Sequence, residues 1–115
     1  MAGTEDVGTF IPLHPLEFRI LMVLARGPSY GTAIVQAIEA AEAGRMKLYP
    51  ANLFRRIRDL SGRDLLEECS APPGADARRT YVRLTRTGNA VLRAEAERLR
   101  ELVREAAAHD LLPEG

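Results

Sequence analysis

The chain has 115 residues, enough for one domain that buries a core, and its hydrophobic share of 46% excludes a disordered polymer. Its longest apolar run, residues 20–25, is far shorter than the roughly 20 residues that cross a bilayer. Glu5 and Asp6 stand where a signal peptide would carry lysine or arginine. The single cysteine, Cys69, cannot form an internal disulfide, which fits a reducing compartment. Together these three features lead us to expect a cytoplasmic protein with no membrane contact.

The charges cancel over the whole chain but not along it. Residues 45–86 hold 10 Arg and Lys against 5 Asp and Glu, whereas acidic residues are in excess on both sides of this segment. A basic segment of this kind suits a polyanionic partner, although charge alone is explained more simply by a solvated basic surface. The positions of these charges on the predicted elements therefore have to decide between the two interpretations.

Three helices are predicted in the first half of the chain, at residues 15–26, 30–43 and 50–62. Pro15 and Pro50 suit the opening turns of the first and third helices, because a helix leaves its first N–H groups unbonded. Ser29 is a suitable N-cap for the second helix. The preceding residues 1–12 lack periodicity and are expected to form a flexible arm.

The third helix divides into an apolar and a polar face. Leu53, Ile57 and Leu60 recur at helical spacing and form the stripe that would face a core. With a turn of about 100° per residue, the opposite face carries Ala51, Asn52, Arg55, Arg58 and Asp59. A small residue, an amide and two guanidinium groups suit the base edges and phosphates of DNA.

Two strand-like segments, at residues 65–69 and 79–84, flank a turn-rich loop and predict a β-hairpin with a long tip. In the second strand, Thr80, Val82 and Leu84 alternate with Arg79, Tyr81 and Arg83. Tyr81 suits packing beneath the hairpin and contact with DNA equally well. Thr85 is a suitable N-cap for a last helix at residues 86–109.

The last helix would be roughly 35 Å long, and an apolar stripe continues to its end. The stripe consists of Leu92, Ala96, Leu99, Val103 and Ala106, and Leu102 widens it. Part of the helix is expected to fold back onto the first helix. A body of about 70 residues cannot cover one whole face of such a helix, so we expect these residues to form a homodimer contact.

Three stretches carry a recognisable pattern, namely LARGPSYG at 24–31, LFRRIRDL at 53–60 and RRTYVRLTRTG at 78–88. With them the chain resembles the PadR family of bacterial transcriptional regulators, in its short form with a single C-terminal helix. The departures from the family pattern are Thr32 in place of an aromatic residue, Ala51-Asn52 in place of Gly-Thr and Asp64 in place of glycine.

The order of elements and the resemblance predict a mainly α fold with a small β-hairpin. We expect a winged helix-turn-helix DNA-binding domain at residues 13–85, a dimerisation helix at 86–109 and a tail at 110–115. The resemblance implies a sequence-specific transcriptional regulator that binds double-stranded DNA at an inverted repeat as a homodimer and acts as a repressor.

The predicted DNA contacts centre on the helix at 50–62, which would enter the major groove. There Asn52 suits adenine, and Arg55 suits guanine or a phosphate. Further contacts are expected from Tyr30, Lys47, Tyr49, Ala51, Arg56, Arg58, Arg78, Arg79 and Arg83. Packing competes with some of these roles: Tyr30 and Tyr49 suit it equally well, and Arg56 lies beside the core stripe. Phe54 is expected in the core.

No catalytic residue, metal site or cofactor is expected, because His14 and His109 lie far apart and one cysteine excludes a four-cysteine zinc site. The resemblance also implies a small apolar effector near the dimer interface. Apolar residues of the first and last helices suit the lining of such a pocket, but core packing explains them more simply. The absence of tryptophan argues against a stacked planar drug. The alternative function is a winged-helix module that docks a protein partner through its long helix without reading DNA.

Overall fold

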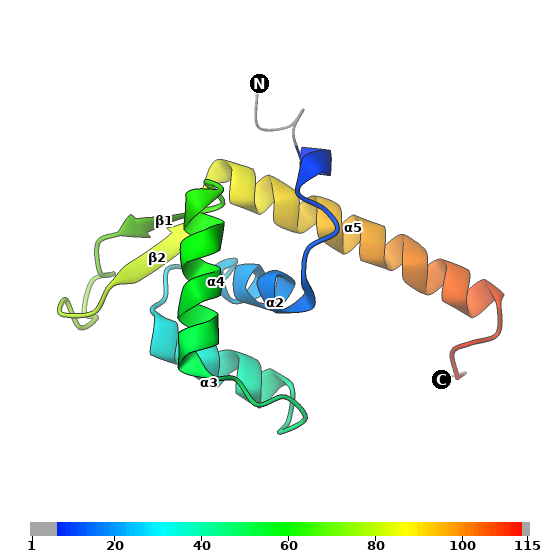
Figure 1. The fold of residues 1–115 in the computed structure, drawn as a ribbon, viewed down its shortest axis with the longest axis horizontal. Coiled ribbons are helices and arrows are strands. Elements are labelled where there is room, and N and C mark those ends of the chain that lie inside the picture. Colours follow the sequence, from blue (N-terminus) through cyan, green and yellow to red (C-terminus); the bar gives the residue numbers. More distant parts are fainter. Residues whose placement is uncertain (1–6, 114–115) are drawn as a thin grey trace.

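The computed structural model describes residues 7–113, and its elements follow the predicted order (Figure 1). These elements are the 3₁₀ helix η1 (Val7–Thr9), the helices α2 (Pro15–Leu24), α3 (Gly31–Ala41) and α4 (Pro50–Gly62), the strands β1 (Leu66–Cys69) and β2 (Tyr81–Leu84), and the helix α5 (Arg86–Ala108). The strands pair antiparallel, with Leu66 opposite Leu84 and Cys69 opposite Tyr81. The chain is therefore mainly α with one hairpin, as the sequence predicts.

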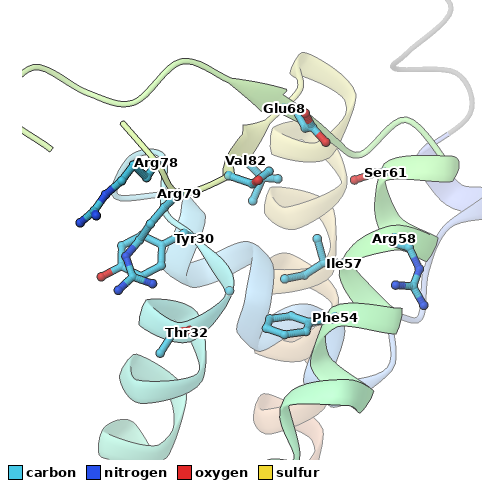
Figure 2. Close-up of a pocket in the computed structure, with 12 residues that line it drawn as sticks. Tyr30, Thr32, Phe54, Ile57, Arg58, Ser61, Glu68, Arg78, Arg79 and Val82 are labelled. Carbon is cyan, nitrogen blue, oxygen red and sulfur yellow. The ribbon is translucent and has the colours of Figure 1, made fainter. Parts of the chain in front are cut away.

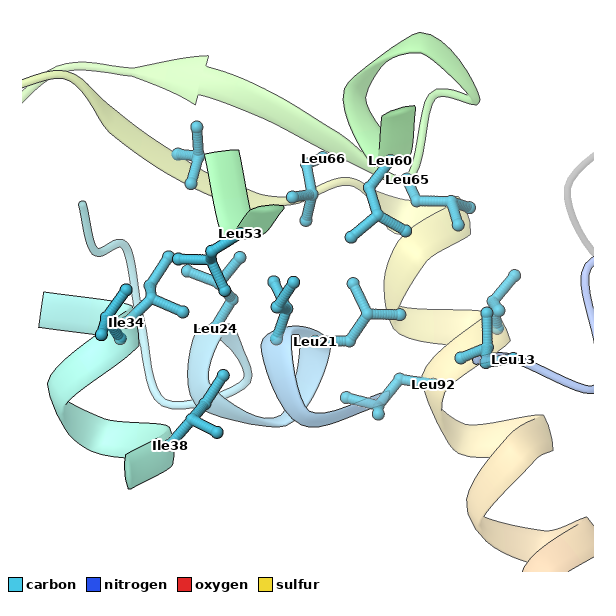
Figure 3. Packing of buried hydrophobic residues seen from close by; sticks show 14 residues of the cluster. Leu13, Leu21, Leu24, Ile34, Ile38, Leu53, Leu60, Leu65, Leu66 and Leu92 are labelled. Carbon is cyan, nitrogen blue, oxygen red and sulfur yellow. The ribbon is translucent and has the colours of Figure 1, made fainter. Parts of the chain in front are cut away.

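The core is built around α2, whose apolar side chains meet those of α3, α4 and α5 (Figure 3). The fully buried aliphatic residues are Ile20, Leu21, Ile34, Ile38, Leu53, Leu60, Leu65 and Val91. Burying one such side chain contributes about 1.5–3 kcal/mol to folding. Leu53 and Leu60 thus hold one side of α4 against α2 and leave the opposite side to solvent.

The helix termini follow local chemistry, with differences from the prediction at the start of α3 and at the ends of α2 and α3. His14 caps α2 through its Nδ1, which accepts a backbone N–H at 3.0 Å, and Glu17 accepts the His14 N–H at 3.2 Å. Ser29 does not cap α3, because the cap position is held by Tyr30. Ser29 instead exchanges two backbone hydrogen bonds with Val82 of β2, which keeps its backbone extended. Both α2 and α3 end two residues earlier than predicted.

The second strand of the hairpin is covered on both faces. It begins at Tyr81 rather than at residue 79, and Tyr81 and Val82 are both buried. The Tyr81 ring meets the Tyr30 ring edge to face, with the centroids 5.4 Å apart. Simple alternation fails here because Ser29 pairs with β2 and brings Tyr30 against it. Tyr81 therefore packs inside the protein and is not open to DNA.

The described part of the expected flexible arm packs against the core. Val7, Phe10 and Ile11 are half-buried against it, and η1 contacts α5. The Leu13 N–H donates to Oε2 of the buried Glu95 on α5, at 2.9 Å. Residues 7–12 are thus tied to the body of the protein, while residues 1–6 lie outside the described range.

The long helix α5 begins in the core and ends outside it. Thr85 caps it as predicted, since its Oγ1 accepts the Gly88 N–H at 2.9 Å. Val91, Leu92 and Glu95 are buried, and the following turns extend away from the body (Figure 1). The first turns of α5 therefore belong to the same hydrophobic core as the preceding elements, and the boundary expected between residues 85 and 86 does not separate two cores.

Among the helices of residues 7–113, none has both the length and the apolar composition that a membrane span requires.

Candidate nucleic-acid interface

The face of α4 opposite the core is open to solvent, as its periodicity predicts. Its exposed residues are Ala51, Asn52, Arg55, Arg58 and Asp59. The packing of Leu53 and Leu60 fixes this orientation, because both side chains are fully buried. In the described part of the chain, neither Arg55 nor Arg58 forms an ion pair, so both guanidinium groups keep their donors for an outside partner.

Arg56 differs from its neighbours on α4 because it faces the protein. Its Nη1 lies 3.3 Å from Oε2 of the buried Glu17 on α2, and Nη2 of Arg63 lies 2.5 Å from the same oxygen. The Arg56 side chain is 28% exposed. The sequence places Arg56 beside the core stripe, but only the fold brings a buried carboxylate to it.

The three arginines expected on the hairpin are each held by a partner. Arg78 is 90% exposed in its side chain and binds both carboxylate oxygens of Asp76, at 3.1 and 3.2 Å. These hydrogen bonds hold the pKa of the Asp76 carboxyl below its ordinary value. Arg83 binds Glu67 at 2.8 Å, and this hydrogen bond raises the pKa of Arg83. The guanidinium of Arg79 lies over the Tyr30 ring, 4.4 Å from its centroid.

The remaining predicted contacts lie around the start of α4 and α3. Lys47 and Tyr49 are exposed just before α4, and Tyr49 is 61% accessible. Tyr30 is half-buried between Tyr81 and Arg79, so packing occupies most of its ring. Lys47 and Tyr49 therefore present more free surface than Tyr30.

Phe54 is not in the core, contrary to the expectation. It is 41% exposed and lies beside Gly31, where an added Cβ would come within 2.1 Å of a ring carbon. The missing side chain at Gly31 therefore makes room for the ring at the surface. Stripe periodicity cannot reveal this position, because it depends on a glycine of another helix.

A groove opens between the start of α3, α4 and the hairpin, with a volume of about 770 Å³ (Figure 2). Its apolar lining includes Phe54, Ile57 and Val82, and Arg58 and Arg79 contribute charge. Thr32 lines it at the position where the family pattern has an aromatic residue. The groove itself is not predicted from the sequence, because its lining residues come from α3, α4 and the hairpin and only the fold brings them together.

The predicted dimer stripe on α5 is only partly available. Leu92 is 7% exposed and belongs to the core of its own chain. Leu102 and Val103 are 47% and 55% exposed, Ala96 is exposed, and Leu99 and Ala106 are half-buried. The unpartnered part of the stripe therefore begins after Glu95.

Across residues 7–113 there is no cluster of three or more potential metal ligands.

Three helices followed by an antiparallel hairpin, with the third helix exposed on one face, define a winged-helix protein. The sequence matches the model of the transcriptional regulator PadR-like family over residues 20–94. The chain belongs to the PadR-like family, whose members are transcriptional regulators and not enzymes. None of the curated proteins matches it in sequence.

Solved structures share the fold. A PadR-like transcription factor from Bacteroides fragilis is 26% identical and superposes with a TM-score of 0.63, covering 82% of this chain and 87% of that one. A transcriptional regulator from Clostridium thermocellum is 19% identical, with a TM-score of 0.67 and coverage of 91% and 93%. RosR of H. salinarum is 24% identical, with a TM-score of 0.60 and coverage of 87% and 98%.

Proposed function

We propose that this chain is a homodimeric repressor that binds an inverted-repeat operator through α4 and the hairpin. The observation that carries the proposal is the open face of α4, where Asn52, Arg55 and Arg58 are exposed and the two arginines have no acidic partner among residues 7–113. Membership of a family of transcriptional regulators supports a DNA target. Bound across a promoter, such a dimer would repress by occlusion.

The first turns of α4 are proposed to meet base edges in the major groove. A helix fits that groove, and its N-terminal residues come closest to the bases. Asn52 would pair with adenine, while Arg55 would bind guanine or a phosphate. Arg58, Lys47 and the exposed Arg78 would hold phosphates on either side of the contact.

The C-terminal half of α5 is proposed to join two copies of the chain. Leu102 and Val103 expose apolar surface beyond the core of the chain, and a second α5 would bury it. Such a dimer would hold two copies of α4 about one DNA turn apart, roughly 34 Å.

The groove of about 410 Å³ between α2 and α5, lined by Phe18, Met22 and Leu99, is our candidate site for a small apolar effector.

The test is a binding titration with duplex DNA from upstream of the gene for this chain, at several salt concentrations. We expect affinity to fall steeply as salt rises, because phosphate contacts release counterions. Arg55→Ala and Arg58→Ala should weaken binding, whereas Arg93→Ala, at an exposed position on α5, removes the same charge as a control. A dimer with no salt-sensitive DNA binding would refute the proposal.

The alternative function is docking to another protein through α5, which the exposed Leu102 and Val103 would also suit. In that case Arg55→Ala and Arg58→Ala would leave function intact, and Leu99→Asp would abolish it. A DNA-binding homodimer requires instead that all three variants fail. Reporter repression in cells, measured for the three variants together, separates the two functions.

A further inference from the structure

Phe54 exposes an apolar ring at the edge of the open face of α4. The residue is 41% exposed, although an aromatic ring gains free energy when it is covered. With a turn of about 100° per residue, Phe54 lies about 40° around the helix from Arg58 and about 60° from Ala51. Both of these neighbours are exposed. The ring therefore belongs to the same surface as the residues proposed to meet DNA.

The position of this ring is set by its neighbours within the protein. Gly31 at the start of α3 leaves room for it, since a Cβ there would come within 2.1 Å of a ring carbon. Leu53, the preceding residue, is fully buried and fixes the rotation of α4. Figure 2 shows Phe54 projecting from α4 toward the side where Tyr30 lies. One edge of the ring thus rests on α3, and its remaining surface faces the groove between α3, α4 and the hairpin.

The charges around this groove favour a polyanion as the molecule that covers the ring. Its lining includes the three arginines Arg58, Arg78 and Arg79 and one acidic residue, Glu68. Arg58 has no ion-pair partner within residues 7–113. Nε of Arg79 lies 3.9 Å from an oxygen of Asp76, which is beyond hydrogen-bond distance. The partner therefore has to combine negative charge with an apolar group that reaches Phe54.

Duplex DNA offers one apolar group on its base edges in the major groove, the C5-methyl of thymine. A phenyl ring has no donor for a phosphate, so Phe54 can add to DNA binding only through apolar contact. We propose that Phe54 is a specificity-determining residue that contacts the methyl group of a thymine in the operator half-site, while the arginines of the groove bind phosphates beside it. This inference rests on the proposed function, because it requires α4 to enter the major groove. It assigns to the half-site a thymine in addition to the adenine that Asn52 suits.

The test compares two forms of the duplex from upstream of the gene for this chain, one made with thymine and the other with uracil throughout. Uracil pairs with adenine as thymine does and lacks only the C5-methyl group. Covering one methyl group raises affinity about fourfold. A dimer on two half-sites should therefore bind the thymine duplex about tenfold more tightly, or better. Fluorescence anisotropy with both duplexes at one salt concentration measures the ratio of the two affinities.

Variants of α4 assign the preference for thymine to a residue. Phe54→Ala should weaken binding of the thymine duplex and bring the two affinities close together, because the methyl group loses its contact. Phe54→Leu keeps an apolar side chain and should keep most of the preference. The matched control is Arg58→Ala, one turn along the same side of α4, which should weaken binding of both duplexes by the same factor. Circular dichroism melting checks the fold of each variant, and the comparison of duplexes in the natural chain depends on no variant.

The outcomes separate this inference from the proposed function. Equal binding of the two duplexes by the natural chain would overturn the role of Phe54 and leave the proposed function standing. A thymine preference that Phe54→Ala retains in full would also overturn it, because the methyl contact would then belong to another residue. A chain that binds neither duplex would refute the proposed function and this inference with it. A preference that Phe54→Ala loses and Arg58→Ala keeps supports the inference, and uracil at single positions of a synthetic duplex then identifies the thymine.

Discussion

Oε2 of Glu17 on α2 lies 2.5 Å from Nη2 of Arg63, the residue that follows α4. The same oxygen accepts a hydrogen bond from Arg56 at 3.3 Å. The Glu17 side chain is 8% exposed, so its charge would be costly to bury without these two donors. The contact fixes α4 on α2 and divides the arginines of α4 into those that hold the fold and those that face outward.

This division predicts different effects for two neighbouring arginines. Arg58→Ala should lower the slope of log K against log salt by about 1, because one phosphate contact is lost. Arg56→Ala should leave that slope unchanged and instead lower the melting temperature, because it removes a donor from Glu17. Fluorescence anisotropy with labelled operator DNA, combined with thermal melting, measures both. A slope change for Arg56→Ala as large as that for Arg58→Ala would contradict the assignment.

Gly88 is expected to tolerate no side chain. A Cβ at this position would lie 2.0 Å from the backbone oxygen of Leu65, which cannot rotate away. Gly88→Ala should therefore lower the free energy of unfolding by about 1–3 kcal/mol or more. Gly62→Ala is the matched control, since nothing lies within 4 Å of its added Cβ and alanine favours the helix. Urea unfolding of the two variants checks the prediction, and equal midpoints would contradict it.

Glu95 should make the stability of the protein depend on pH. The hydrogen bond from Arg98 holds the pKa of Glu95 below its ordinary value of 4.5, burial opposes this, and the Leu13 N–H reinforces it. A carboxyl whose pKa is lower in the folded chain stabilises the fold above the unfolded pKa, and loses this effect as pH falls through the folded pKa.

The measurement for Glu95 is the urea midpoint from pH 7 downward, in the natural chain and in Glu95→Gln. We expect the natural chain to be more stable at neutral pH, and the difference between the two to shrink below about pH 4–5, as the carboxyl takes up its proton. Because Asp76 and Glu97 also have lowered pKa values, only the difference between the chains is informative. A constant difference down to acid pH would rule out this role.

Two leucines of α5 should respond in opposite ways to the same substitution. Leu102→Asp should produce folded monomers, because Leu102 is 47% exposed and would lose only its contact with a second copy. Leu92→Asp should unfold the chain, because it buries a charge at a position that is 7% exposed. Light scattering and circular dichroism report the mass and the fold. A Leu102→Asp protein that stays dimeric would show that the interface lies elsewhere.

Three features are predictable from local sequence: the order of the elements, the stripe of α4 and the Thr85 cap. Each of these depends on residues a few positions apart: Leu53 and Leu60 share a face because of the helical period, and Thr85 reaches the Gly88 N–H within one turn. The outward position of Arg55 and Arg58 follows from the same period, so this much of the candidate site was readable without the fold.

Which of the predicted site residues remain exposed depends on contacts between distant parts of the chain. Arg56 meets Glu17 across 39 positions of sequence, Ser29 pairs with Val82 instead of capping a helix, and Phe54 occupies the space that Gly31 leaves empty. None of these contacts has a local signal, because each joins side chains or strands that only the packing of α2, α3 and the hairpin brings together. Local periodicity sets the face a residue occupies, whereas long-range packing sets the partner it finds there.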